Sequence, residues 1–235
     1  MEKQREKNFR QASSPAKAVV FLPTLNEEQG APMVIKGLLE QGFREIVVVD
    51  GGSTDATVEQ CKKLGALVMA QKGTGKGGAF KTFLSAYPLE DDSVVVMLDA
   101  DATYSPQDAK KLVAAVNAGA DVASGSRKML VYNLKSLVHA IGGRVITLIA
   151  SIIFLKWHPD FTTGYWAFRA SALKKMQVTA QGFNLEANLF AETAKRNLSL
   201  AIVPVEYGKR VGYAKLSTFD AFKILFSLLK YRFLK

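Results

Sequence analysis

Residues 94–104, VVVMLDADATY, decide the fold that the sequence predicts. The apolar run Val94–Leu98 predicts a buried strand, and the acidic pair Asp99 and Asp101 follows directly at its carboxyl end. Because side chains alternate along a strand, the two carboxylates point to the same side, with only Ala100 between them. Carboxylates that close repel each other unless a cation or a proton lies between them. The stretch therefore indicates either a Mg²⁺ or Mn²⁺ site suited to a diphosphate, or two solvated aspartates at a strand end.

Apolar strands and helix-like segments alternate on both sides of this stretch. Strands are expected at 17–22, 45–49, 66–70 and 121–124, and helices at about 31–41, 55–64, 75–86 and 105–118. Continuous apolar strands joined by helices predict an α/β fold, with a mainly parallel, Rossmann-like sheet and helices on both faces. In such sheets ligands bind beyond the carboxyl ends of the strands, where Asp50 and the acidic pair both lie.

Length and composition limit the kinds of partner. The 235 residues, 49% of them hydrophobic and 22% charged, are enough for one α/β domain with its own core. The net charge of +10 favours anionic partners: phosphorylated small molecules, anionic lipid or nucleic acid. One cysteine, Cys61, excludes an internal disulfide, and the two histidines, His139 and His158, are expected to be structural or surface residues rather than metal ligands.

The chain divides into an arm, a main domain and a tail. The charged segment 1–16 is expected to be a flexible arm rather than a signal peptide, and 17–216 a single catalytic domain. Within it, 134–157 is apolar, but its longest uninterrupted apolar run, Val145–Leu155, is shorter than the roughly 18–20 residues that span a bilayer. The segment is expected either to pack on the sheet or to lie on a membrane as interfacial helices. The tail, 217–235, is expected to be a basic amphipathic helix at a membrane surface.

The later part of the domain carries three further expectations. The aromatic side chains of 161–168 are expected in the core, and 200–207 is expected to be a last strand that Pro204 places at a sheet edge. In the amphipathic helix expected over 184–196, Glu186 is interpreted as a solvated charge, with a role in orienting an acceptor as the alternative.

Five motifs in order resemble those of the inverting GT-A glycosyltransferases of family 2. They are PTLNEE (23–28), VVVDGGSTDAT (47–57), GKGGA (75–79), LDADATY (98–104) and GSR (125–127). Three later segments are similar to the polyprenyl-phosphate sugar synthases, the subgroup typified by dolichol-phosphate mannose synthase: DFTTGYWAFR (160–169), VPVEY (203–207) and RVGYAKLS (210–217). The resemblance spans residues 17–217 and implies the GT-A fold of nucleotide-diphospho-sugar transferases.

The resemblance implies a role for each matched position. Contacts to a nucleotide sugar would come from Pro23, Leu25, Asn26, Glu27, Val49, Asp50, Gly51, Ser53, Lys76, Asp99, Ala100 and Asp101. A Mg²⁺ or Mn²⁺ ion would be held by Asp99, Asp101 and Thr103. Phosphate groups, including that of the acceptor, would be bound by Arg127, Arg144, Arg210 and Lys215, and the catalytic residues would be Asp101, Arg127 and Asp160.

The resemblance also implies a reaction. A hexose would pass, with inversion, from GDP-mannose, UDP-glucose or UDP-N-acetylglucosamine to a polyprenyl (dolichyl or undecaprenyl) phosphate. The enzyme would be peripheral, at the cytoplasmic face of a membrane, without a nucleic acid partner, and with a homo-oligomer or a membrane subunit left open. An acceptor phosphate is already ionised near neutral pH, so it needs no strong base, and arginines would hold the two anions together.

Two other enzymes and one binding module remain as alternatives. A family 2 transferase acting on a saccharide hydroxyl would need a carboxylate base, for which Asp160 is the candidate. A nucleotidyltransferase also uses an acidic pair and a glycine-rich loop, but it releases pyrophosphate. A basic module that binds nucleic acid would need its charges in one stripe, whereas here they are scattered among the motifs.

Overall fold

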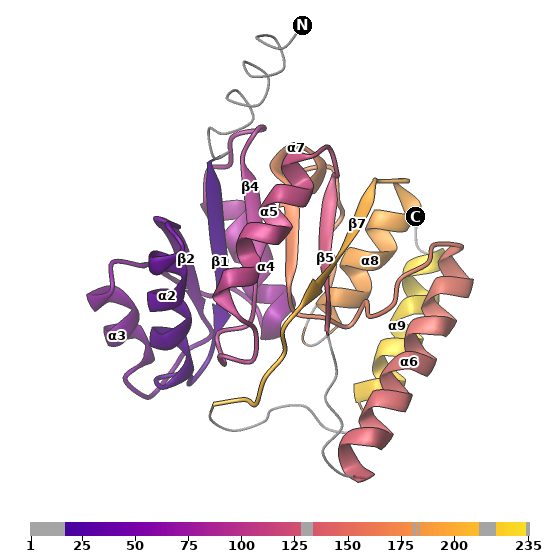
Figure 1. Cartoon of the computed structure of the whole chain (residues 1–235), viewed down its shortest axis with the longest axis horizontal. Helices are drawn as coiled ribbons and strands as arrows, with labels where there is room; N and C mark the ends of the chain where they lie inside the picture. The colour runs from indigo at the N-terminus through magenta and orange to yellow at the C-terminus, as the bar shows by residue number, and fades with distance from the viewer. Residues whose placement is uncertain (1–16, 128–133, 181, 183, 212–219, 234–235) are drawn as a thin grey trace, which may run out of the picture.

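A computed structural model describes residues 17–127, 134–180, 182, 184–211 and 220–233. Seven strands form one sheet in the order β3-β2-β1-β4-β6-β5-β7, with helices on both of its faces (Figure 1). Among the described strands only β6 is antiparallel to its neighbours, β4 and β5. The prediction of a mainly parallel α/β sheet between two layers of helices is therefore confirmed.

The described elements have the following bounds. The strands are β1 (Ala18–Thr24), β2 (Glu45–Asp50), β3 (Leu67–Ala70), β4 (Val94–Met97), β5 (Val122–Arg127), β6 (Trp166–Arg169) and β7 (Leu200–Val205). The helices are α2 (Gly30–Glu40), α3 (Thr57–Lys63), α4 (Gly75–Ala86), the short 3₁₀ turn η1 (Pro106–Asp108), α5 (Ala109–Asn117), α6 (Leu134–Phe154), α7 (Ala170–Leu173), α8 (Leu185–Lys195) and α9 (Asp220–Phe233).

The alternation of side chains along the strands divides the core in two. On β1, Val20 and Leu22 face the layer of α2, α3 and α5, whereas Val19 and Phe21 face the layer of α4, α6, α8 and α9. Strands buried on both faces have no polar side to show, which explains why their sequences are continuous apolar runs. Cys61, on α3, is fully buried in the first of these layers, as a packing residue would be.

The register of the central strands brings the acidic residues to one edge of the sheet. β1 pairs with β2 on one side and β4 on the other, in parallel, with Thr24 opposite Asp50 and Phe21 opposite Met97. From β1 the chain continues to β2 and β3 on one side of β1 and then crosses to β4 on the other side. In sheets of this kind, ligands bind in the crevice beside such a reversal of strand order. We call this edge, where the parallel strands end, the carboxyl edge.

One strand was not predicted. Residues 161–168 were expected to supply core aromatics, and they do, but Trp166–Arg169 also forms β6 between β4 and β5. An antiparallel strand of four residues has no alternation long enough to be read from sequence, and only its packing between two partners defines it. The expectation of an edge position for the last strand is confirmed, because β7 ends the sheet.

The first residue of α2 touches the loop that carries the acidic pair. A Cβ atom on Gly30 would lie 2.5 Å from the carbonyl oxygen of Ala100 and 2.9 Å from Cα of Asp101. Both contacts are to backbone, so a side chain at this position cannot be accommodated by a rotamer change.

Gly30→Ala is therefore expected to lower the free energy of unfolding by about 1–3 kcal/mol, because it forces α2 and the Asp99–Asp101 loop apart. Urea denaturation measures this change. Gly142→Ala on α6 is the matched control, since a Cβ at that position would meet nothing within 4 Å, and alanine there should be neutral or stabilising by about 0.5–1 kcal/mol. Equal effects at both positions would contradict the close approach.

Candidate active site

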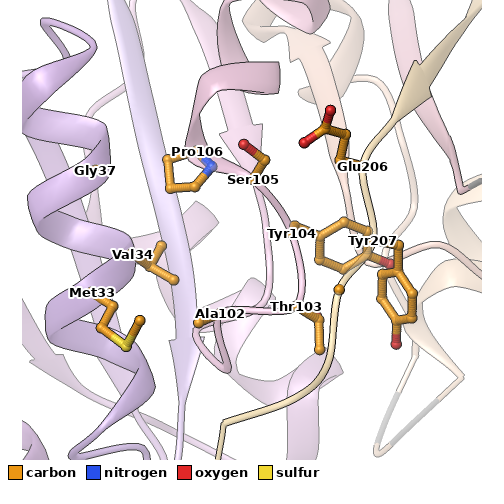
Figure 2. Close-up of a pocket in the computed structure, with 11 residues that line it drawn as sticks. Met33, Val34, Gly37, Ala102, Thr103, Tyr104, Ser105, Pro106, Glu206 and Tyr207 are labelled. Atoms are coloured by element: carbon orange, nitrogen blue, oxygen red, sulfur yellow. The ribbon is translucent and has the colours of Figure 1, made fainter.

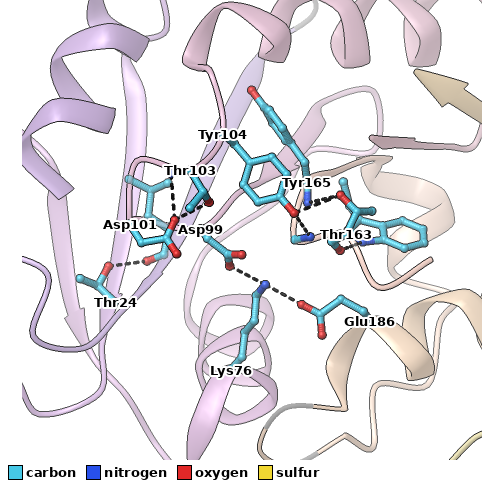
Figure 3. Close-up of polar contacts among 12 residues, drawn as sticks. Thr24, Lys76, Asp99, Asp101, Thr103, Tyr104, Thr163, Tyr165 and Glu186 are labelled. Atoms are coloured by element: carbon cyan, nitrogen blue, oxygen red, sulfur yellow. Dashed lines mark hydrogen bonds and ion pairs between the residues drawn. The ribbon is translucent and has the colours of Figure 1, made fainter. Parts of the chain in front are cut away.

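The first aspartate of the acidic pair belongs to a group of three charged side chains. Nζ of Lys76, from the first turn of α4, lies 2.6 Å from Oδ1 of Asp99 and 2.6 Å from Oε1 of Glu186, in the first turn of α8 (Figure 3). The Lys76 side chain is only 12% exposed. Burial would lower the pKa of Lys76, but the two carboxylates outweigh that effect and raise the pKa above its ordinary value. Lys76 is therefore a permanent cation at the carboxyl edge.

The second aspartate is held by an arginine from the other end of the chain. Nη1 of Arg210 lies 2.9 Å from Oδ2 of Asp101, and Nη2 of the same guanidinium pairs with Oε1 of Glu27. Oδ1 of Asp101 accepts hydrogen bonds from the backbone N–H and the hydroxyl of Thr103, at 3.1 and 2.6 Å. The Thr103 hydroxyl, which the sequence predicts as a metal ligand, donates to Asp101 in this structure.

A third group of charged side chains lies at the end of β5. Arg127 donates from Nε and Nη2 to both carboxylate oxygens of Asp160, at 2.7 and 2.6 Å, and its backbone N–H also donates to Asp160. The guanidinium carbon lies 5.2 Å from the centre of the Tyr207 ring, and Nη2 reaches the hydroxyl of Thr162 at 2.8 Å. Burial would lower the pKa of Arg127, but its neighbours, Tyr104 and Asp160 foremost, raise it. Both oxygens of Asp160 are thus occupied by a permanent cation.

The loops after β1 and β2 brace each other. The carboxylate of Asp50 accepts from the backbone N–H groups of Gly52 and Ser53, both at 3.0 Å, and from the Ser53 hydroxyl at 2.5 Å. The Ser53 hydroxyl in turn accepts from the N–H of Asn26, whose side-chain oxygen accepts from Thr54. These reciprocal bonds fix the carboxyl edge before any ligand binds, as a preorganised site requires.

The remaining predicted positions divide into three groups. Leu25 and Gly51 are exposed at the same edge, while Pro23 is half-buried and Val49 and Ala100 are buried behind it. Arg144 is exposed on α6, and none of the contacts described for residues 17–127 and 142–211 joins it to the acidic pair. Lys215 lies outside the described residues.

Glu186 corrects the sequence interpretation. It was interpreted as a solvated charge, but its side chain is 14% exposed and is paired with Lys76. The pair joins residues 110 positions apart, so local sequence carried no signal beyond an acidic residue in the first turn of a helix. Gly164 was also missed: a Cβ there would lie 2.1 Å from Oδ2 of Asp99, so glycine is needed for the 160–169 segment to pass the carboxylate.

The donor set suits a metal ion together with a diphosphate better than a bare metal ion. Asp99 and Asp101 supply carboxylate oxygens, the ligands that Mg²⁺ and Mn²⁺ prefer. Within the described part of the chain, however, no three His, Cys, Asp or Glu side chains gather into a complete cage. Nε of Arg210 is buried and has no hydrogen-bond partner among the described residues, which leaves a donor without a protein acceptor in that part of the chain. Phosphate oxygens would supply the missing metal ligands and would also accept a hydrogen bond from Nε of Arg210.

A cavity of about 580 Å³ adjoins the loop that carries the acidic pair (Figure 2). One wall is α2, through Met33 and Val34, and the others are residues 102–106 and 206–208. Tyr207, which lies under the Arg127 guanidinium, also lines it. The cavity is mainly apolar, and neither Lys76 nor Arg210 lines it. It is therefore poorly suited to a diphosphate.

His158 lies buried beneath the Arg127–Asp160 pair. Its Nδ1 accepts from the backbone N–H of Asp160 at 2.9 Å, and its ring packs against Trp166 and Phe190. Burial lowers the pKa of His158 from 6.5 to about 4. The expectation of a structural role is confirmed for this histidine, whereas the side chain of His139 lies outside the described residues.

Because the folded state resists protonating His158, this residue makes the protein less stable in acid. The contribution of neutral His158 to the free energy of unfolding is complete above pH 6.5. It is lost as the pH falls from 6.5 to about 4, and the total loss is on the order of 3 kcal/mol. Urea denaturation of the wild type and of His158→Gln at several pH values in this window measures it. Between pH 6.5 and about 4 the free energy of unfolding should fall less steeply in His158→Gln than in the wild type. An equal dependence on pH in the two proteins would contradict the low pKa of His158.

Comparison with known proteins agrees with this geometry. The family model described as glycosyl transferase family 2 matches residues 19–177. Glycosyltransferase AglJ of Haloferax volcanii is 32% identical over 84% of this chain, which spans 65% of that protein, somewhat under two thirds of its length. The dolichyl-phosphate hexose transferase of the same organism is 33% identical over 85% of this chain and 86% of its own length.

A solved structure shares the fold. The glucosyl-3-phosphoglycerate synthase of Mycobacterium tuberculosis, solved with Mn²⁺, uridine-diphosphate-glucose and phosphoglyceric acid, superposes with a TM-score of 0.73 at 21% identity, over 97% of this chain and 84% of that one. At this identity the likeness concerns the GT-A fold alone. With the family model matching well over half of its length, the chain belongs to glycosyl transferase family 2.

Proposed function

We propose that this glycosyltransferase moves a hexose from a nucleoside diphosphate sugar to the phosphate of a polyprenyl phosphate, with inversion. The observation that carries the proposal is the pair of Arg127 and Asp160. Because both oxygens of Asp160 are bound by Arg127, the carboxylate is poorly placed to take a proton from a sugar hydroxyl. A buried arginine beside the carboxyl edge suits an acceptor that is already an anion.

Each charged group has a separate task in this reaction. Asp99 and Asp101 would hold a Mg²⁺ or Mn²⁺ ion, which would supply positive charge to offset the charge that develops on the leaving diphosphate. Lys76 and Arg210 hold positive charge beside the same carboxylates and stabilise the diphosphate as it departs. Arg127 binds the acceptor phosphate and reduces its repulsion from the donor.

The polyprenyl part of the acceptor is supported by two observations. One relative that matches most of this chain is named as a dolichyl-phosphate hexose transferase. The other is a surface of exposed apolar side chains on α6 and α9 and just after α6, which we call the apolar helix face; its members are Val145, Leu148, Ile152, Leu155, Trp157, Phe226, Leu229 and Phe233. The helices pack side by side (Figure 1), so these residues belong to one side of the molecule.

The apolar helix face suits a membrane surface rather than a membrane interior. In the part of the chain that the structure describes, no helix has the length and hydropathy to cross a bilayer. Lys230 and Arg232 are exposed in the last turns of α9, where they would meet anionic headgroups while Phe233 enters the acyl boundary. We place the enzyme at the cytoplasmic face of its membrane, where nucleotide sugars are available.

Replacing two members of this face is expected to weaken membrane binding. Trp157→Ser with Phe233→Ser should reduce binding to vesicles that contain anionic lipid by at least about tenfold, because each buried aromatic contributes about 1.5–3 kcal/mol. Co-sedimentation measures the binding. Leu67→Ser is the control, since it removes a half-exposed apolar side chain from β3, at the opposite end of the sheet from β7. Equal binding by the wild type, the double variant and Leu67→Ser would contradict the proposed role of the apolar helix face in membrane binding.

A transfer assay tests the reaction itself. The full chain is incubated with Mg²⁺ or Mn²⁺ and with labelled GDP-mannose, UDP-glucose or UDP-N-acetylglucosamine. Separate reactions contain a polyprenyl phosphate, phosphoglyceric acid or a free saccharide as acceptor. Label in the lipid extract together with release of nucleoside diphosphate supports the proposal.

The other outcomes identify the alternatives. Labelled phosphoglyceric acid without labelled lipid would indicate a water-soluble phosphorylated acceptor, the kind present in the structure of the fold neighbour. A labelled saccharide would restore the hydroxyl acceptor and a base role for Asp160. Release of pyrophosphate would indicate a nucleotidyltransferase, and the polyprenyl-phosphate proposal fails in all three cases.

A further inference from the structure

Each aspartate of the acidic pair already has a positive partner within the protein. Nζ of Lys76 lies 2.6 Å from Asp99, and Nη1 of Arg210 lies 2.9 Å from Asp101. The side chains of these two cations are 12% and 25% exposed, so solvent screens them weakly. We call Lys76 and Arg210 the internal counterions.

Of the remaining two oxygens of the pair, one accepts hydrogen bonds and the other is crowded by backbone. Oδ1 of Asp101 accepts two hydrogen bonds from Thr103. Oδ2 of Asp99 lies against the backbone of Gly164, where a Cβ would come within 2.1 Å of it. A metal ion that binds both aspartates must therefore displace an internal counterion, or else lie close to two buried positive charges.

The internal counterions would gain new negatively charged partners once a diphosphate is bound. Each is held by a second carboxylate that is not part of the pair, Glu186 for Lys76 and Glu27 for Arg210, so neither has to leave the site. In the part of the chain that the structure describes, the buried Nε of Arg210 also has no hydrogen-bond partner. A diphosphate brings several anionic oxygens that can accept hydrogen bonds from both cations, which would leave the two aspartates available to hold a metal ion.

We propose that Lys76 and Arg210 keep free divalent metal away from Asp99 and Asp101, so that metal and nucleoside diphosphate bind cooperatively and neither binds tightly alone. The inference rests on the proposed use of a nucleotide sugar and describes how that site is regulated. Because coupling between two ligands is reciprocal, the nucleotide raises the affinity for metal by the same factor as the metal raises the affinity for nucleotide. Such a site does not fill with metal between catalytic cycles.

The backbone links this exchange to the segment that carries Arg210. The N–H of Val211 donates to the carbonyl oxygen of Asp101 at 3.1 Å, and that of Gly208 to the carbonyl oxygen of Thr103 at 2.8 Å. The segment 208–211 therefore lies along the loop of the acidic pair, and Arg210 is positioned on Asp101 by its own backbone. This arrangement explains how a residue so distant in sequence acts as a fixed counterion rather than a mobile surface charge.

Titration of the full chain with Mn²⁺ tests the inference without any activity measurement. Calorimetry, or the loss of the electron paramagnetic resonance signal of free Mn²⁺, gives its dissociation constant alone and with saturating GDP or UDP. The wild type should bind Mn²⁺ on the order of 5–150-fold more tightly with the nucleotide that it recognises. In Arg210→Gln the affinity for Mn²⁺ alone should rise and this ratio should fall.

Two further variants separate charge exclusion from general damage. Lys63→Gln removes one positive charge from an exposed pair on α3 and should leave both dissociation constants unchanged. Arg210→Lys keeps the charge and should keep the weak binding of free Mn²⁺, even if Arg210→Gln folds poorly by circular dichroism. Tight binding of Mn²⁺ without nucleotide in the wild type overturns this inference and leaves the proposed function intact. Absence of Mn²⁺ binding with both nucleotides rejects the metal-dependent function, and this inference with it.

Discussion

Asp101→Asn is expected to lower the rate of hexose transfer by roughly a thousandfold. A metal ion that offsets the charge of the leaving diphosphate contributes several kcal/mol to the transition state, and each 1.36 kcal/mol is a factor of ten in rate. Asparagine keeps the shape of Asp101 and can still accept from Thr103, but it offers no charge to a metal ion or to Arg210. The measurement is kcat/KM for the donor at saturating acceptor, in the transfer assay described above.

A matched carboxylate tests whether this loss belongs to the site. Asp91 is 75% exposed before β4, where it pairs with Lys174, and Asp91→Asn should leave transfer unchanged. Raising the Mn²⁺ concentration should recover part of the activity of Asp101→Asn, since Asp99 still offers one carboxylate. Activity within a few-fold of the wild type in Asp101→Asn would exclude Asp101 from the metal site and remove the central element of the proposed mechanism.

The acidic pair could be predicted because everything that places it is local. The apolar strand β4 ends at Met97, two residues before Asp99, and parallel strands bring their carboxyl ends to one edge of the sheet, so the sequence itself locates the charges. The same holds for Asp50, the last residue of β2. The position of a residue at the end of a buried strand is set by that strand, so it can be predicted once the strand is recognised in the sequence.

The partners of these aspartates could not be predicted in the same way. Arg210 reaches Glu27 across 183 residues, and Lys76 reaches Glu186 across 110. Nothing in the local sequence distinguishes Glu186 from the exposed acidic residues of other helices, because its burial depends on the distant Lys76 of α4, with which it pairs. Arg210 was predicted as a phosphate-binding residue, and only the structure reveals that it also serves as the counterion of Asp101.

The Arg127–Asp160 pair offers the second large effect. Arg127→Lys keeps the positive charge but loses the two-pronged grip, and it is expected to lower kcat/KM for the acceptor on the order of a hundredfold. Asp160→Asn should lower it too, because the variant no longer orients the guanidinium. Folding is checked by thermal denaturation, since breaking a buried pair costs about 3–5 kcal/mol.

The double variant distinguishes the two roles proposed for Asp160. If Asp160 acts only by holding Arg127, then Arg127→Lys with Asp160→Asn should be little worse than either single variant, because residues that act as a unit are not additive. The activity of Asp160→Asn should also keep the pH profile of the wild type. A general base instead contributes typically 10²–10⁴-fold independently of Arg127, and its loss removes the acidic limb of the profile. Additive losses with a changed profile would thus point to a hydroxyl acceptor, whereas non-additive losses with an unchanged profile fit an acceptor that arrives already charged.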